Sequence, residues 1–237
     1  MASERSVITL ATEFAQNDHR AHHDQGLSSY VDIAKELLTL GSLVRSIAGG
    51  AVTNTFHTRE RSLYEPLKAT LERCLPANEM ISIENNLYRT THPKMQTDLS
   101  IHSIWHKGTS YKDKSLECSH FIEIKSVFHG ETLLASQIDA DLEKLIACEA
   151  SYDATCFFVI VGLSGRLKRS VAASTLLAHD KSIFARRLST DRTVHLRAAA
   201  RHETCEPHVA VFQVSAQRTR LEQTRRSGAW YSIFQRR

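Results

Sequence analysis

The sequence predicts an α/β fold in which helices flank a mixed central sheet, and three observations support this class. Residues 97–105 and 120–127 carry apolar side chains at every second position, which is typical of neighbouring strands. Residues 132–150 carry them three and four apart, as an amphipathic helix does. The continuous apolar run Cys156–Val161 is typical of a strand that is buried on both faces.

The elements before the first of these strands are predicted to be mainly helical. Apolar positions three and four apart indicate a helix near residues 29–48, with Ser28 and Ser29 as its cap, a break near Gly41 and an end at Gly49–Gly50. A strand is expected at residues 81–88, before the two strands described above.

A second helix is expected at residues 58–74, and Pro66 leaves two interpretations of it open. Its apolar stripe includes Leu63 and Leu67, and the helical repeat places Glu60 on the same inward face. Either the helix bends at Pro66, or Ser62 caps a later start with Glu65 as its capping-box partner. In the second case Glu60 lies just before the helix.

The order of elements up to residue 163 is therefore helix, three strands, helix and strand, with the polar residues 106–119 joining the second and third strands. Beyond Ser164–Gly165, residues 171–177 and 198–201 favour helix, and residues 209–214 predict one more strand. The sequence shows no internal repeat or clear linker.

Length and composition indicate one domain. The chain has 237 residues, of which 42% are hydrophobic and 24% charged, and this is ordinary for a globular protein. We expect a single domain at 1–237, made of a core at 58–163, a helical N-terminal addition and a basic extension at 164–237. Five cysteines without a Cys-x-x-Cys pair predict neither a disulfide framework nor a structural zinc site.

The sequence also favours a cytoplasmic protein without membrane contact. Its longest apolar run, Cys156–Val161, is far too short to cross a bilayer, and the N-terminus lacks the basic and apolar blocks of a signal peptide.

Positive charge is concentrated in the C-terminal third. Residues 164–237 contain 15 Lys or Arg and 5 Asp or Glu, a local charge of +10, which leaves −6 for the rest of a chain whose net charge is +4. Such a region can neutralise a phosphate backbone, although a solvated basic surface is the alternative. The basic residues form three clusters: Arg166, Lys168 and Arg169; Arg186 and Arg187; and Arg218, Arg220, Arg225 and Arg226.

The two acid-bearing strands carry the candidate chemistry. Alternate side chains of a strand share a face, so Glu123 and Lys125 point the same way. If the strands pair as a hairpin, Asp98 joins them, and two adjacent carboxylates favour a hard divalent cation. The alternative is that Asp98 only forms a turn and that Glu123 and Lys125 form a solvated ion pair.

Asp98 followed by Glu123-Ile124-Lys125, in this order of elements, resembles the PD-(D/E)xK nuclease superfamily, whose fold is restriction-endonuclease-like. The resemblance covers about residues 58–163. The sequence departs from the family's name in having Thr97 rather than proline before Asp98. The helix after the motif offers Gln137 and Asp141 but no tyrosine four residues after the glutamine, unlike the subgroup of processive exonucleases.

The resemblance implies a Mg²⁺-dependent endonuclease, in which Mn²⁺ can substitute. Asp98, Glu123 and the Ile124 carbonyl would be metal ligands, with Glu60 as an additional ligand and Glu65 as the second choice for that place. Lys125 would stabilise the developing negative charge or position the attacking water.

The expected substrate is double-stranded DNA, with the basic clusters along it. We expect a type II restriction enzyme or a related defence nuclease that acts as a homodimer, since two sites are needed to cut two strands. One alternative is a nucleic-acid-binding or assembly protein that keeps the fold without turnover. The other is a nuclease toxin, which would need a delivery region or an immunity partner that this chain does not show.

Overall fold

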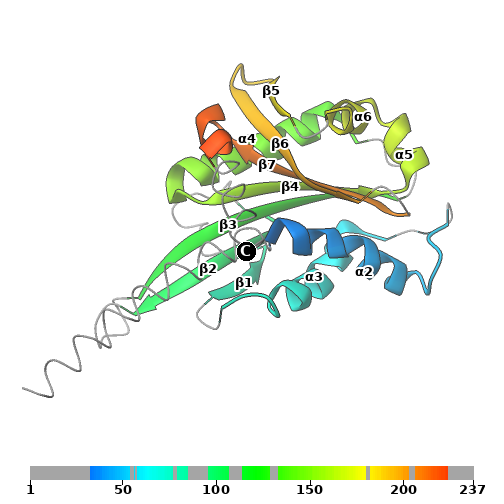
Figure 1. The fold of residues 1–237 in the computed structure, drawn as a ribbon, viewed down its shortest axis with the longest axis horizontal. Coiled ribbons are helices and arrows are strands. Elements are labelled where there is room, and N and C mark those ends of the chain that lie inside the picture. The colour runs from blue at the N-terminus through cyan, green and yellow to red at the C-terminus, as the bar shows by residue number, and fades with distance from the viewer. Residues whose placement is uncertain are drawn as a thin grey trace, which may run out of the picture.

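The protein forms one seven-stranded mixed sheet with helices on both faces (Figure 1), so the predicted α/β class is confirmed. The computed structural model describes residues 33–53, 56, 58–76, 79–84, 96–106, 114–128, 133–179, 182–202 and 206–223. The strands are β1 Glu79–Ile83, β2 Leu99–His106, β3 Lys114–Val127, β4 Thr155–Gly162, β5 Ile183–Arg187, β6 Thr193–His202 and β7 His208–Ser215. The helices are η1 Leu37–Thr39, α2 Leu40–Ile47, η2 Glu60–Leu63, α3 Tyr64–Leu71, α4 Ala135–Tyr152, α5 Ser164–Arg169 and α6 Val171–Leu177.

The strand order in the sheet is β1-β2-β3-β4-β7-β6-β5. Neighbouring strands pair antiparallel except β3 and β4, which are parallel and are joined by α4. A parallel pair requires such a crossover, because the chain must return to the same end of the sheet. The predicted order of helix, three strands, helix and strand is confirmed.

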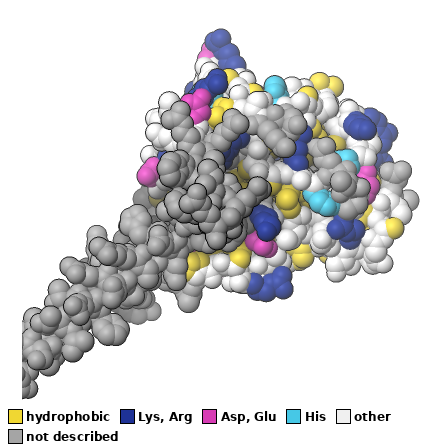
Figure 2. Space-filling view, in the orientation of Figure 1, with side chains coloured by type: hydrophobic (Ala, Val, Ile, Leu, Met, Phe, Trp, Pro, Cys, Tyr) yellow, Lys and Arg dark blue, Asp and Glu magenta, His cyan; other side chains and the backbone are white. Residues whose placement is uncertain are grey.

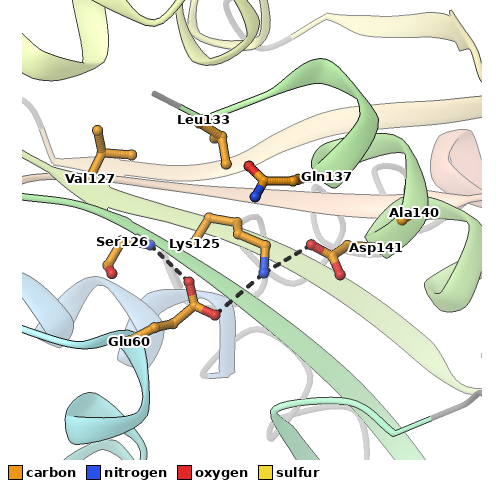
Figure 3. A pocket seen from close by; sticks show the side chains of 8 residues that line it. All are labelled: Glu60, Lys125, Ser126, Val127, Leu133, Gln137, Ala140 and Asp141. Carbon is orange, nitrogen blue, oxygen red and sulfur yellow. Dashed lines mark hydrogen bonds and ion pairs between the residues drawn. The ribbon is translucent and has the colours of Figure 1, made fainter. Parts of the chain in front are cut away.

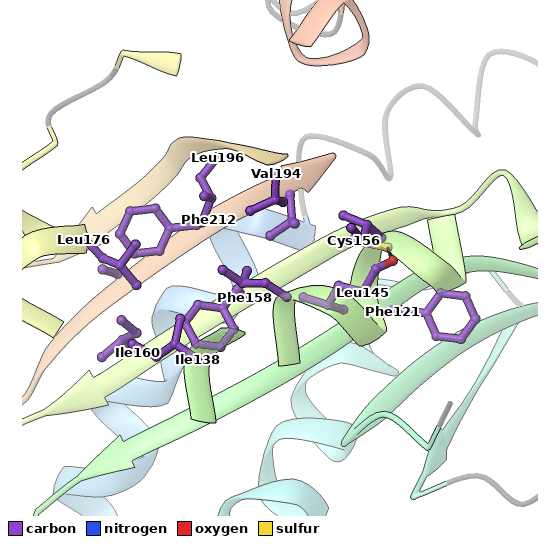
Figure 4. Packing of buried hydrophobic residues seen from close by; sticks show 14 of the residues in the cluster. Phe121, Ile138, Leu145, Cys156, Phe158, Ile160, Leu176, Val194, Leu196 and Phe212 are labelled. Carbon is purple, nitrogen blue, oxygen red and sulfur yellow. Dashed lines mark hydrogen bonds between the residues drawn. The ribbon is translucent and has the colours of Figure 1, made fainter. Parts of the chain in front are cut away.

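Two apolar clusters hold the helices against the sheet. On one face α4, α5 and α6 pack against Phe158 and Ile160 of β4 (Figure 4). On the other face α2 and α3 pack against Phe157 and Val159 of the same strand. Both faces of β4 are therefore buried, which explains why its sequence is continuously apolar rather than alternating.

Close packing at the end of β4 depends on Gly162. A Cβ atom at this position would lie 2.5 Å from the carbonyl oxygen of Val127, so a larger residue would push β4 away from β3. The backbone N–H of Leu163 donates to that same oxygen over 3.3 Å.

The first predicted helix is interrupted at Leu37–Thr39, before the expected break near Gly41. The 3-10 turn η1 comes before α2, and Gly41 lies inside α2. A Cβ at Gly41 would lie 3.4 Å from the Val209 side chain, so the glycine allows α2 to approach β7 closely. The predicted start of this helix, with Ser28 and Ser29 as its cap, lies outside the described residues.

The structure decides between the two interpretations of Pro66: the α-helix starts later and does not bend at the proline. Helix α3 begins at Tyr64 after the 3-10 turn η2, which puts Pro66 in its first turn, where an N–H has no partner within the helix. Glu60 therefore lies before the α-helix. The capping box expected from Ser62 and Glu65 is wrong, because Leu63 occupies the cap position and no side chain caps it.

The hairpin of β2 and β3 is longer than predicted. Strand β3 begins at Lys114, so part of the stretch 106–119 that was expected to be a connection is strand. The β2–β3 register shifts at Ile101–His102, where Ser119 is the extra residue of β3. Strand β1 starts at Glu79, two residues before the predicted start, and residues 85–88 of the predicted strand lie outside the described part.

The C-terminal third is part of the sheet rather than an extension of it. It supplies β5, β6 and β7, and β7 pairs directly with the central strand β4. The predicted helix at 171–177 and strand at 209–214 are confirmed. The helix expected at 198–201 is wrong, because these alanine-rich residues belong to β6, and pairing with β7 overrides their helical propensity. None of the helices in the described part of the chain is long and apolar enough to span a membrane.

Candidate active site

The candidate site lies where the sheet has an opening beside β3. The paired residues of β2 and β3 end at Leu99 and Ile122, whereas β3 continues to Val127. On its other side this part of β3 remains paired with β4. The edge of β3 that faces the end of β2 is therefore open to groups from both helical layers.

Asp98, the residue before β2, lies beside the part of β3 that is not paired with β2. Its Oδ2 atom accepts a hydrogen bond of 2.7 Å from the backbone N–H of Ile124. Its Oδ1 atom accepts one of 2.5 Å from the hydroxyl of Tyr64, at the start of α3. The carboxylate is thus held beside the peptide bond that follows Glu123.

Glu60 occupies the next position along the same open edge. Its Oε2 atom accepts a 3.2 Å hydrogen bond from the backbone N–H of Ser126, and its Oε1 atom lies 3.3 Å from the Lys125 ammonium. Alternate residues of a strand direct their backbone groups to the same side, so the Ile124 carbonyl also points to this edge. The structure therefore brings Glu60 to the predicted site, while Glu65 is exposed.

Glu123 and Lys125 share the face of β3 that α4 covers, as the alternation predicted. The Lys125 ammonium lies 3.0 Å from Asp141 Oδ2 (Figure 3), and the Lys144 ammonium lies 2.5 Å from Glu123 Oε1 and 3.4 Å from Asp141 Oδ1. The Glu123 side chain is only 1% exposed, and its Oε2 atom has no hydrogen-bond partner among the described residues.

A pocket of about 650 Å³ opens next to these side chains. Glu60 and Lys125 line one side of it, and Gln137 and Asp141 of α4 line the other (Figure 3). The Lys125 ammonium lies between the Glu60 and Asp141 carboxylates, so a ligand in the pocket would meet a positive charge whose position is fixed from two sides.

Burial dominates the electrostatics of the acids. Burial raises the pKa of Glu60 and Asp98, and it raises the pKa of Glu123 well above the ordinary value, with the Asp98 charge adding to the effect. Burial by itself would lower the pKa of Lys125, but the carboxylates of Glu60 and Asp141 outweigh it and raise that pKa. Burial likewise favours neutral Lys144, and the Glu123 charge reverses this and raises its pKa.

The donor chemistry fits a divalent cation. Four carboxyl groups, those of Glu60, Asp98, Glu123 and Asp141, lie near two ammonium groups, so full ionisation of the acids would leave the site with a net negative charge. The available donors are oxygen atoms, which suit Mg²⁺, and Glu123 Oε2 is buried without a hydrogen bond. Asp98, Glu123 and the Ile124 carbonyl would hold the ion, although no three His, Cys, Asp or Glu side chains in the described ranges already form a metal cluster.

The predicted DNA-binding residues divide into several groups. Arg166 is half-buried, and Lys168 and Arg169 are exposed, all on α5. On the face shown in Figure 2, Lys and Arg side chains lie in separate groups rather than in one continuous patch. Arg225 and Arg226 lie outside the described residues.

The described arginines of the other two clusters are engaged within the protein. Arg186 forms an ion pair of 2.7 Å with Asp139. Arg218 pairs with Glu222 on the exposed surface. Arg220 donates to Asp153 Oδ1 over 2.7 Å and lies 3.4 Å from Glu149 Oε1, so it joins the segment after β7 to the end of α4. Arg186 and Arg220 therefore make contacts that stabilise the fold, and their place along DNA stays a prediction.

Tyr64 and Lys144 were not predicted as residues of the site. Asp141 was mentioned only as a residue of the helix after the motif, together with Gln137. The sequence carries a signal for Asp141 and Lys144. With Gln137 they are spaced by four and three residues, so all three share one face of a helix. Tyr64 follows Glu60 by four residues, but the 3-10 turn between them makes a helical repeat a poor guide there.

No family model matches this chain, and no curated protein or solved structure matches it.

Proposed function

We propose that this protein is a Mg²⁺-dependent DNA endonuclease with a restriction-endonuclease-like core of the PD-(D/E)xK superfamily. The observation that carries the proposal is the position of Asp98. It lies immediately before β2 begins and is hydrogen-bonded to the Ile124 N–H, so it is held against the part of β3 that carries Glu123 and Lys125. The seven-stranded mixed sheet and the α4 crossover are compatible with this core.

The side chains of the site suit phosphodiester hydrolysis. A bound Mg²⁺ would neutralise phosphate oxygens and lower the pKa of a water molecule. Tyr64 and the Ile124 N–H orient Asp98 for binding that ion. Lys125 lines the pocket, held by Glu60 and Asp141, where its ammonium would stabilise negative charge on a phosphate.

The proposed substrate is double-stranded DNA, and the proposed setting is restriction or a related defence. The exposed basic residues of α5 and the net charge of +10 in residues 164–237 support a polyanionic partner. A homodimer would present two sites to the two strands of a palindromic target.

A second candidate function is nucleic-acid binding without turnover. The observation that favours it is the coverage of Glu123, whose side chain is 1% exposed and already paired with Lys144. A protein in which the lysine permanently fills this position would keep the fold and its basic surface but would not cleave DNA.

Cleavage of supercoiled plasmid with and without Mg²⁺ separates the two candidates. We expect nicked or linear plasmid only when the metal ion is present. Glu123→Gln and Lys125→Ala should give no product. Both variants should keep a DNA affinity within a few-fold of the parent, because phosphate contacts elsewhere carry affinity. Two matched controls should cleave normally. Glu143→Gln alters the ion pair between Glu143 of α4 and Arg192, and Lys68→Ala removes an ammonium from α3.

Product formation that persists in Lys125→Ala would assign the activity to another site. Metal-independent DNA binding with no cleavage by the parent protein would favour the second candidate.

A further inference from the structure

Lys144 is the closest cation to Glu123. It lies on α4 with its ammonium 2.5 Å from Glu123 Oε1, and its side chain is 18% exposed, against 1% for Glu123. A Mg²⁺ ion that binds this carboxylate through Oε1, alone or together with Oε2, would lie about 2.0–2.1 Å from that oxygen, so the ion and the ammonium cannot both occupy this position.

The surroundings of Lys144 provide a second place for its charge. Its ammonium already lies 3.4 Å from Asp141 Oδ1, one helical turn earlier on α4. Asp141 lines the pocket, whereas Glu123 does not. A lysine that leaves Glu123 can therefore keep a carboxylate partner while its ammonium moves toward the pocket wall, next to Lys125.

We propose that Lys144 is a resident counter-ion that occupies the cation position of Glu123 in the metal-free protein and is displaced onto Asp141 when a divalent ion binds. This inference rests on the proposed function, since it assumes that Glu123 is a metal ligand. It makes Lys144 a positioning residue: its ion pair holds the buried Glu123 carboxylate in place, and its ammonium competes with the divalent ion for that carboxylate. Displacement also adds a second ammonium to the pocket where a phosphate would lie.

Metal binding without DNA tests the inference. The thermal unfolding midpoint of the whole chain is measured against Mn²⁺ and Mg²⁺ concentration for the parent, Lys144→Met, Lys144→Arg and Lys125→Met, since an ion that binds only the folded state raises the midpoint. We expect Lys144→Met to reach half-saturation at about a tenfold lower metal concentration than the parent, because a repelling charge has been removed from the ligand. Lys144→Arg retains the charge and should stay close to the parent.

Lys125→Met is the matched control for charge alone. It removes one ammonium from the same site, but that ammonium pairs with Glu60 and Asp141 rather than with Glu123. Equal gains in metal affinity from Lys125→Met and Lys144→Met, or no gain from Lys144→Met while the parent binds metal, would overturn the inference and leave the proposed nuclease intact. If neither the parent nor Lys144→Met is stabilised by either ion, the metal site itself fails, and both proposals fail with it. Should Lys144→Met not fold without metal, its recovery of folded signal on metal titration gives the same half-saturation value.

Discussion

The carboxylate of Asp98 accepts a 2.7 Å hydrogen bond from the backbone N–H of Ile124, a residue that lies 26 positions later in the chain. This bond replaces the strand pairing that ends at Leu99 and Ile122. The candidate site is thus built on the paired strands β3 and β4 and on the end of β2. Its central geometry is set by where β2 begins, one residue after Asp98.

The hydroxyl of Tyr64 fixes the other oxygen of Asp98, and its removal should reduce cleavage. Burial raises the pKa of Tyr64, so the hydroxyl remains protonated and donates to Asp98. A hydrogen bond to a charged group contributes about 1.5–3 kcal/mol, so we expect Tyr64→Phe to slow single-turnover cleavage by about 10- to 100-fold. The buried ring stays in the core, and DNA affinity should remain within about twofold.

Tyr152→Phe, at the end of α4, is the control for loss of a tyrosine hydroxyl and should cleave at the parental rate. A parental rate in Tyr64→Phe as well would show that this hydrogen bond does not orient Asp98 for catalysis.

Much of the core could be predicted from sequence because its side-chain patterns are set by burial on one or two faces. The continuous apolar run of β4 and the helical stripe of α4 are such cases. The helix prediction for residues 198–201 was wrong for the opposite reason. Alanine has high helical propensity, and these residues form a strand only because they pair with β7, which no local sequence pattern reveals. Strand β5 went unpredicted because it has only five residues and ends in Arg186 and Arg187.

The site was predictable along β3 but not across the sheet. Alternation along one strand places Glu123 and Lys125 on one face, and the hairpin brings Asp98 near them. The contacts of Lys144 with Glu123 and of Tyr64 with Asp98 depend on how α4 and α3 pack against the sheet. Sequence spacing fixes which residues share a helix face, but it does not fix which strand residue that face meets.

The buried acids predict that stability changes with pH in a direction opposite to that of ordinary salt-bridged carboxylates. The pKa values of Glu60, Asp98 and Glu123 are raised from 4.5, 3.8 and 4.5, so between these values and the raised ones the folded state binds more protons than the unfolded state. Their contribution to stability is therefore complete below the unfolded pKa values and is lost as pH rises through the folded ones. Without divalent ions, the midpoint difference between Glu123→Gln and the parent should shift in favour of the variant as pH rises from about 5 to about 8.

Thermal unfolding in EDTA across this pH range measures the effect, and Glu143→Gln serves as the control. Parallel midpoint curves for Glu123→Gln and the parent would contradict a raised pKa at Glu123. Adding Mg²⁺ should stabilise the parent most at the high end of the range, where the carboxylates are charged.

The basic residues of α5 should contribute to DNA affinity by neutralising phosphates. Replacing Arg166, Lys168 and Arg169 together by glutamine should weaken binding and flatten the dependence of log affinity on log salt, by up to about 0.9 for each phosphate that is no longer neutralised. A matched triple variant on the other helical layer, Lys35→Gln/Lys68→Gln/Arg73→Gln, removes the same charge and should leave the slope nearly unchanged. Equal slopes for both triple variants in fluorescence anisotropy titrations would show that α5 does not lie along the DNA.

Arg220 should affect stability rather than DNA binding. Its guanidinium donates to Asp153 Oδ1 and to the Asp153 carbonyl, and it lies 3.4 Å from Glu149 Oε1, with 32% of its side chain exposed. After allowance for this partial exposure, we expect Arg220→Ala to lower the free energy of unfolding by about 1–3 kcal/mol in urea denaturation.

Arg218→Ala is the matched control for this removal of charge, because Arg218 is 62% exposed and its ion-pair partner among the described residues is Glu222, one helical turn away. Its effect on the free energy of unfolding should stay within about 0.5 kcal/mol. If Arg220→Ala were as stable as Arg218→Ala and lowered the salt dependence of DNA binding by the equivalent of about one phosphate, the guanidinium would be available to DNA, and its contacts with α4 would not stabilise the fold.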